Sequence, residues 1–470
     1  MKMRRLLLLI LTLIIALIGC KKQPTNSTFF TGFFPNSKDS LVILYANDIA
    51  IDTTFLNKDK NFTFSLNIKE SKLYNFEIGG KYQYIYLEPL DSLVVYANIL
   101  RFEESISFSG KGAAINNFLL SQLNNIDIQS DELKKYHSLP PIAYKEKIDS
   151  ILMIKKRECD NFIKNHSYLS DKAKNIALVS SMFPLYKEIE IYPFIYQDKN
   201  KNLINHLLPS EFYNYRKQID YNNSFLEYYR PYYSYMVMYV NNLAFTKYTH
   251  NNSTLVDVNR ELGFHLEKIK IIDSLFDKGS LRDNLYRNAA YAYIFNIQEH
   301  AQYQDYFDKF AKYNKDNEHK AELDKVFKNV IALQAGQIPP DFDLIDTKGT
   351  LTKFSEIQKP EVTIYYFWSV TQRELSNLIF DRIAQLKSLF PNVKFVGIDI
   401  GQDKTQWRKR ISENQWTDQY HSINFMDLSQ KFLINNINKS VIIDKNGRII
   451  SAFEDIFSPN LEKILLYKAS

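Results

Sequence analysis

The pattern of hydrophobic and polar positions changes twice along the chain. From Phe29 to Phe108, hydrophobic residues form short runs or alternate with polar residues. The runs cover residues 41–45, 61–66, 84–87, 93–96 and 106–108, and turn residues such as Gly79-Gly80 separate them. Several short strands at this spacing predict a β-sandwich domain over residues 29–112.

Between residues 113 and 335 the hydrophobic residues recur at intervals of three and four, as at Leu323, Val326, Phe327 and Val330. This spacing predicts a helical domain. Prolines predict helix breaks at positions 140–141, 184, 193, 209 and 231. The aromatic run 228–239 could form a groove for a peptide or glycan, although helix packing explains it more simply.

The last third of the chain has an α/β pattern. The segment Gly336–Pro340 marks a boundary, and residues 336–470 form the third predicted domain. A hairpin is predicted over 341–352, strands over 362–368 and 393–400, helices over 375–390 and 405–414, a hairpin over 440–450 and a closing helix over 460–468. The predicted fold class is therefore a multidomain protein with a β-sandwich, a helical middle domain and a C-terminal α/β domain.

Segment Val362–Leu375 resembles the first central strand and helix of a thioredoxin domain of the TlpA/ResA type. In that family the strand ends in Phe-Trp-Ala/Ser, and a Cys-x-x-Cys redox motif follows. Counting from Phe367-Trp368, the two cysteine positions correspond to Gln372 and Leu375. The cis-proline of the family corresponds to Asn438 or its neighbour Lys439, where a trans bond is expected. The resemblance implies a thioredoxin-like domain with a degenerate redox site.

The N-terminal part resembles the β domain of TlpA-like lipoproteins from Bacteroidetes. The resemblance rests on segments 87–95 and 108–116, which match a Pro-Gly-Asp-Ser turn and a Gly-x-Gly-Ala-x-x-Asn junction. Leu90 stands where that family usually has glycine. No chemistry can be transferred from this domain.

The first nineteen residues combine a basic start with a short apolar run, which predicts a secretory signal peptide. The run ends in Leu17-Ile18-Gly19-Cys20, which resembles a bacterial lipobox. This resemblance implies cleavage before Cys20, lipidation of Cys20 and a tether over residues 20–28. Lys21 and Lys22 favour the outer membrane by analogy with lipoprotein sorting. We therefore expect a protein anchored to the cell envelope by lipid.

Candidate chemistry is sparse. The chain has two cysteines, and lipidation of Cys20 would leave Cys159 as a free thiol, which is expected to pack as a small hydrophobic residue. The eight histidines have no metal-ligand spacing, so no metal and no cofactor are predicted. His421 is expected at the surface, and the hydroxyls of Ser369 and Thr371 have no histidine nearby in sequence.

The formal net charge of +6 falls by three when the signal peptide is removed, which gives no basis for nucleic-acid binding. The leading hypothesis is an envelope lipoprotein whose thioredoxin-like domain binds an envelope protein or peptide. The alternative is a TlpA-like thiol–disulfide oxidoreductase, weak or acting through Cys159 as a monothiol. A third hypothesis is a structural envelope component. Exposure of Cys159 beside Gln372 would favour the enzyme.

Overall fold

The computed structural model describes residues 27–196, 208–209, 211–250, 258–296, 302–357 and 362–468. The predicted signal peptide and Cys20 lie outside these ranges. The chain divides into two compact units, residues 1–254 with 275–277 and residues 255–274 with 278–470. The division passes through the predicted helical domain. Within the described ranges, every helix is too short or too polar to span a bilayer.

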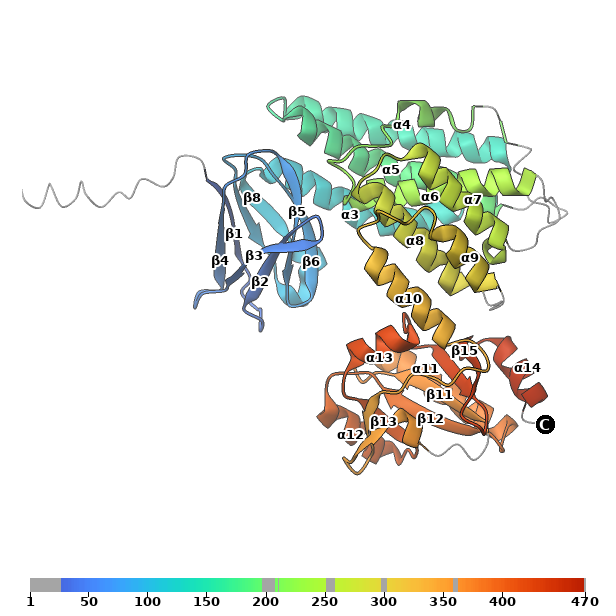
Figure 1. The fold of residues 1–470 in the computed structure, drawn as a ribbon. Coiled ribbons are helices and arrows are strands. Elements are labelled where there is room, and N and C mark those ends of the chain that lie inside the picture. Colours follow the sequence, from blue (N-terminus) through green and yellow to red (C-terminus); the bar gives the residue numbers. More distant parts are fainter. Residues whose placement is uncertain are drawn as a thin grey trace, which may run out of the picture. The chain divides into compact units, whose positions relative to one another are not determined.

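The first unit begins with two four-stranded sheets that share one hydrophobic core, which confirms the predicted sandwich (Figure 1). One sheet has the order β4-β1-β7-β8 and the other β3-β2-β5-β6. The strands are β1 Thr28–Phe33, β2 Leu41–Ala46, β3 Ile49–Phe55, β4 Asn61–Leu66, β5 Lys72–Ile78, β6 Lys81–Leu87, β7 Ser92–Tyr96 and β8 Ser107–Lys111. Along β4 and β7 every second side chain is buried, because alternate residues of a strand face the core.

Two consecutive asparagines at the start of helix α3 (Ala113–Lys134) close one edge of each sheet. Asn116 accepts a hydrogen bond from the Tyr86 N–H (2.8 Å) and donates one to the Tyr86 carbonyl (2.8 Å) on edge strand β6. Asn117 makes the same pair of bonds with Phe108 on edge strand β8, at 2.9 and 2.8 Å. Each side-chain amide therefore replaces a neighbouring strand. The asparagine of the sequence junction has a structural role.

The turn before β7 contains Leu90, the residue that departs from the motif noted in the sequence. Leu90 has a φ of 66°, in the left-handed region that favours glycine. The next residue, Asp91, is buried, and one of its oxygens accepts the Glu88 N–H at 2.9 Å. A Cβ on Gly112 would lie 2.8 Å from that carboxylate oxygen. Glycine at position 112 therefore leaves room for the Asp91 side chain.

Helices complete the first unit: α2 Phe102–Ser105, α3, α4 Pro141–Asn165, α5 Asp171–Ile195 and α6 Arg230–His250. The predicted breaks at Pro184 and Pro193 are wrong, because both prolines lie inside α5. Much of α5 is buried, and its packing outweighs the hydrogen bonds that the prolines remove. From the aromatic run, Tyr229, Tyr232 and Tyr235 are buried, as helix packing predicts.

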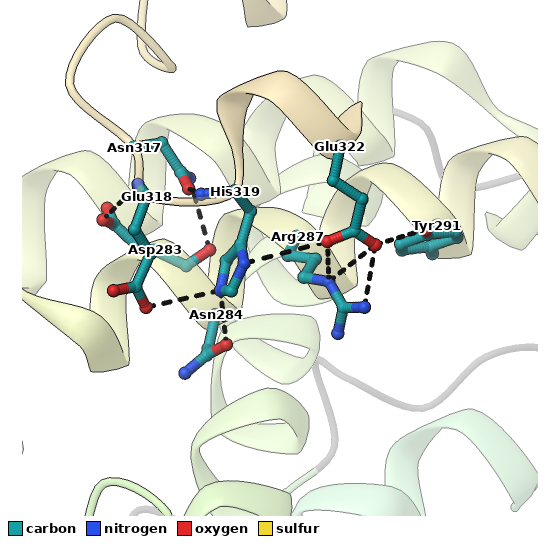
Figure 2. Close-up of polar contacts among 8 residues, drawn as sticks. All are labelled: Asp283, Asn284, Arg287, Tyr291, Asn317, Glu318, His319 and Glu322. Atoms are coloured by element: carbon teal, nitrogen blue, oxygen red, sulfur yellow. Dashed lines mark hydrogen bonds and ion pairs between the residues drawn. The ribbon is translucent and has the colours of Figure 1, made fainter. Parts of the chain in front are cut away.

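The second unit begins with α7 Leu262–Leu275, α8 Ser280–Asn296, α9 Tyr303–Phe310 and α10 Lys320–Ala332. Figure 2 shows the polar network that joins α8 to α10. The Glu322 carboxylate accepts hydrogen bonds from Arg287 (2.8–3.0 Å) and from the Tyr291 hydroxyl (2.6 Å). His319, at the start of α10, pairs through Nε2 with Asn284 Oδ1 at 2.8 Å. These bonds fix α10, which leads into the C-terminal sheet.

That sheet has seven strands in the order β10-β9-β13-β12-β11-β14-β15. Strands β11, β12 and β13 are mutually parallel, and the remaining pairings are antiparallel. The strands are β9 Asp343–Ile345, β10 Leu351–Lys353, β11 Thr363–Trp368, β12 Lys394–Asp399, β13 Gln419–Ser422, β14 Lys439–Ile443 and β15 Ile449–Asp455. The helices are α11 Arg373–Leu389, α12 Lys404–Asn414, α13 Phe425–Phe432 and α14 Pro459–Lys468. Strand β13 and helix α13 were not predicted from the sequence.

Candidate ligand-binding corner of the C-terminal sheet

The carboxyl ends of β11, β12 and β13 meet at one edge of the sheet. Parallel pairing aligns Trp368 with Asp399, and Asp399 with His421. Aligned residues on neighbouring strands project from the same face, so these three side chains share one surface. In open α/β sheets, ligands bind in the crevice outside the carboxyl ends of the strands. We call this region, together with Ser369 and Thr371, the strand-end corner.

Asp399 and His421 form a buried pair in the strand-end corner. His421 Nδ1 lies 2.8 Å from Asp399 Oδ2, and the side chains are 6% and 0% exposed. The Trp407 ring covers His421 at a centroid distance of 5.2 Å. The expectation that His421 lies at the surface is therefore wrong. Its carboxylate partner follows an apolar strand and allows the imidazole to be buried without losing its hydrogen bond.

The loop from β11 into α11 brings hydroxyl groups to the same corner. Ser369 Oγ and Thr371 Oγ1 are 2.8 Å apart. Ser376, in the first turn of α11, accepts the Ser369 N–H at 3.1 Å and donates to the Ser369 carbonyl at 2.9 Å. This reciprocal pair fixes the loop against the helix. The loop is therefore rigid where a thioredoxin enzyme would hold its first cysteine.

One oxygen of the buried carboxylate has no partner among the described residues. Asp399 Oδ1 accepts no hydrogen bond there. A Cβ placed on Gly401 would lie 3.2 Å from this oxygen and 3.4 Å from Ser369 Oγ, so both atoms border the same point in space. An unpaired buried carboxylate oxygen is energetically costly. The strand-end corner is therefore suited to accept a hydrogen bond from a donor group.

The two positions expected to correspond to the Cys-x-x-Cys motif lie at the start of α11. Gln372 is the residue before the helix, and its exposed side chain makes no capping hydrogen bond. Leu375 is half-buried in the first turn. Arg373 and Glu374 are exposed between them. The spacing matches a Cys-x-x-Cys motif, but neither side chain can supply a thiolate nucleophile.

The position of the family cis-proline is held by Asn438. The described backbone has no cis peptide bond, so the bond before Asn438 is trans as expected. The Asn438 side chain donates to Asp455 Oδ2 at 2.6 Å. Its neighbour Lys439 is buried, and its ammonium nitrogen lies 2.6 Å from the Phe432 carbonyl. Burial lowers the pKa of Lys439 to about 7.

Aromatic residues surround the strand-end corner. Gln419 accepts from the Trp368 indole N–H at 3.0 Å and donates to the Tyr366 hydroxyl at 2.8 Å, and all three side chains are buried. The Arg410 guanidinium lies over Trp368 and over Trp416, 5.5 and 5.6 Å from the ring centres. The role of Gln419 could not be predicted from the sequence, because β13 is short and polar and its pattern is typical of a loop.

Cys159 is the only thiol in the described part of the chain, and it belongs to a different unit from the strand-end corner. It belongs to α4 in the first unit, whereas Gln372 and Leu375 belong to the second. Its side chain is 0% exposed, as expected for a cysteine that packs as a small hydrophobic residue. Burial raises the pKa of the Cys159 thiol, which disfavours the reactive thiolate. These properties oppose a monothiol enzyme.

No metal centre is evident among the described residues, because they contain no group of three or more histidine, cysteine or acidic side chains placed to share an ion.

Ser422, the last residue of β13, is buried, and its hydroxyl has no hydrogen-bond partner in the described structure. The strand-end corner therefore offers hydroxyls, one carboxylate and one imidazole. These groups can bind and orient a polar ligand, and none of them can exchange disulfides.

Comparisons with known proteins point to the same region. A comparison with curated proteins finds no match. Among solved structures, the thioredoxin domain of a thiol-disulfide oxidoreductase from Bacteroides vulgatus shares 19% identity, with a TM-score of 0.23, over 28% of this chain and 97% of that one. A thiol:disulfide interchange protein from Bacteroides sp. shares 15% identity, with a TM-score of 0.25, over 30% and 93%. Residues 360–449 match the thioredoxin-like family, and the C-terminal part of the chain is therefore a thioredoxin-like domain.

Proposed function

We propose that the chain is an envelope lipoprotein whose thioredoxin-like domain binds a protein or peptide and does not catalyse disulfide exchange. The observation that carries this proposal is the identity of the residues at the redox positions. Gln372 and Leu375 occupy them, and the sequence has no cysteine after Cys159. A thioredoxin-type reaction needs one thiolate to attack a disulfide and a second thiol to resolve the mixed disulfide. The fold is present without the atoms that react.

The exposed start of α11 and the strand-end corner supply the proposed binding surface. Gln372, Arg373 and Glu374 are exposed and offer amide, guanidinium and carboxylate groups. Behind them, the rigid loop at Ser369 and the buried Asp399 limit how the surface can rearrange. A preorganised polar surface loses little entropy when it binds a partner. This arrangement favours recognition of an extended or polar segment over covalent chemistry.

The competing function is a TlpA-like oxidoreductase, weak or acting through Cys159. The decisive assay uses a soluble version that starts at Lys21. Reduction of a protein disulfide would be followed with dithiothreitol as the electron source, for the natural sequence and for Cys159→Ser. We expect both rates to equal the dithiothreitol blank. A rate above the blank that disappears in Cys159→Ser would refute the binding proposal and assign the activity to a single thiol.

The anchor is tested separately in the full-length protein. Replacement of Cys20 by serine removes the thiol that the predicted lipid would modify. We expect the natural protein in the membrane fraction and Cys20→Ser in the soluble fraction or with its signal peptide retained, while Cys159→Ser fractionates like the natural protein. Equal membrane association of all three, with the signal peptide removed from Cys20→Ser, would contradict the lipoprotein part of the proposal and leave the disulfide assay unaffected.

A further inference from the structure

We infer that a cavity in the first unit binds a small carboxylate that carries a ring. The cavity has a volume of about 400 Å³ and lies where four elements of that unit meet, namely β6, α3, α5 and α6. Ligand pockets for small molecules begin at roughly 300 Å³. This site is separate from the strand-end corner and does not depend on the function proposed above.

The aromatic run that the sequence analysis noted contributes one wall. Tyr229, immediately before α6, and Tyr232 and Tyr235 on α6 are spaced by three and buried in the core. Arg230 and Pro231 lie between these positions and line the cavity. Residues spaced by three or four share one face of a helix, so the run has a packing face and a cavity face. Helix packing thus accounts for the tyrosines, and the intervening residues remain available to contact a ligand in the cavity.

The cavity carries positive charge. Lys187 from α5 and Arg230 from α6 line it, and none of its lining residues is acidic. Lys187 Nζ is 3.8 Å from Glu188 Oε1, a weak contact, and the other oxygen of that carboxylate pairs with His137. Arg230 forms no ion pair within the described structure. Arg230, which has no ion pair there, and Lys187, whose contact with Glu188 is long, favour an anionic ligand. An arginine can bind a carboxylate with two parallel hydrogen bonds.

The remaining walls are flat and weakly polar. The rings of Tyr82, Tyr84, Pro184 and Pro231 border the cavity. Tyr84 is held edge-on against Tyr229, with ring centres 5.8 Å apart, so its position is fixed. The Tyr82 phenol is uncharged at neutral pH, as an ordinary tyrosine is, and does not repel an anion. Ring walls beside cations fit a ligand that combines a flat or ring-shaped body with one carboxylate.

An acidic sugar and an aromatic acid share this chemistry, and the test separates them. Binding of D-glucuronate and of benzoate would be measured by calorimetry at constant ionic strength on the soluble version that starts at Lys21. D-glucose and benzyl alcohol serve as neutral counterparts of the same ring type. The variants are Arg230→Gln and Lys187→Gln. Lys174→Gln, on α5 but outside the cavity, is the matched control, and thermal unfolding shows whether each variant is folded.

We expect saturable binding of at least one acid and no measurable binding of its neutral counterpart. Arg230→Gln should weaken binding about tenfold or more, because hydrogen bonds between charged groups are lost, while Lys174→Gln should have no effect. If glucuronate binds, the ligand is an acidic sugar, and if benzoate binds, it is an aromatic acid. The inference fails if neither acid binds more tightly than about 1 mM. It also fails if the folded Arg230→Gln and Lys187→Gln variants bind as well as the natural protein.

Discussion

Lys439 offers the sharpest test of the energetics of the thioredoxin-like domain. It stands next to the lost cis-proline position and is buried, and its nitrogen lies 2.6 Å from the Phe432 carbonyl at the end of α13. Burial lowers its pKa from 10.5 to about 7. We predict that Lys439→Met stabilises the domain at pH 6 and loses this advantage at high pH.

The magnitude follows from the pKa difference. A depressed lysine pKa means that the unfolded chain binds more protons than the folded protein between pH 7 and about 10.4, so stability rises with pH across this window. Each pKa unit corresponds to about 1.4 kcal/mol, which gives an ionisation cost of about 5 kcal/mol below pH 7. Loss of the hydrogen bond to Phe432 costs methionine roughly 1–2 kcal/mol. The expected net gain at pH 6 is therefore about 3–4 kcal/mol.

The three tryptophans of the chain make the measurement specific. Trp368, Trp407 and Trp416 all belong to the thioredoxin-like domain, so tryptophan fluorescence reports the unfolding of this domain alone. Urea unfolding would be followed from pH 6 to pH 9.5 for the natural protein, Lys439→Met and Lys445→Met. Lys445 is an exposed lysine of the same hairpin and controls for the loss of surface charge.

The lowered pKa of Lys439 predicts a difference in the pH dependence of the free energy of unfolding as well as a gain in its value at pH 6. Above pH 7, the free energy of unfolding of the natural protein should rise by up to about 1.4 kcal/mol per pH unit relative to Lys439→Met. If Lys439→Met is less stable than the natural protein at pH 6, the ammonium is charged and well solvated in the fold. The same conclusion would follow if the two pH profiles were parallel. Either result would refute the lowered pKa of Lys439.

Three further predictions concern other parts of the molecule. Leu90→Gly should raise the free energy of unfolding of the first unit by up to about 1 kcal/mol, measured by circular dichroism, because leucine is strained at a φ of 66°; Leu90→Ala should give no such gain. Partial burial raises the pKa of Glu322, but hydrogen bonds from Arg287 and Tyr291 outweigh it and hold the net pKa below its usual range. Glu322→Gln should therefore destabilise α8–α10 at neutral pH and match the natural protein after acidification through that lowered pKa, as judged by thermal unfolding. Gln372→Cys with Leu375→Cys should form a disulfide and reduce a protein disulfide slowly, because both thiols stand at a helix start; a double variant without a disulfide would place the motif elsewhere.

The sequence predicted the parts of the thioredoxin-like domain in which local pattern and tertiary environment agree. Strand β11 is an unbroken apolar and aromatic run, and all six of its residues are buried. The helix that follows begins at Arg373, two residues before the predicted start. The sequence also predicts residues other than cysteine at the two motif positions, because this prediction depends only on residue identity at a fixed distance from Phe367-Trp368.

The strand-end corner could not be predicted, because its polar residues are buried through pairing across the sheet. His421 and Gln419 make β13 look like a loop, and their partners Asp399 and Trp368 lie 22 and 51 residues away. A single sequence does not reveal such pairs. Pro184 illustrates the opposite error, because its local preference predicts a break that packing on both sides of α5 overrides.

The paired asparagines of α3 have a consequence for how the first unit unfolds. Asn116 and Asn117 each hydrogen-bond to the backbone of one edge strand. Those backbone groups lack these partners until the helix has formed. Leu120, one turn further along α3, also belongs to the core of the sandwich. The strands and the first long helix should therefore melt as one cooperative block. A fragment cut at residue 112 would expose two bare edges able to recruit strands from other molecules, and the natural boundary of an autonomous sandwich lies inside the helix that follows it.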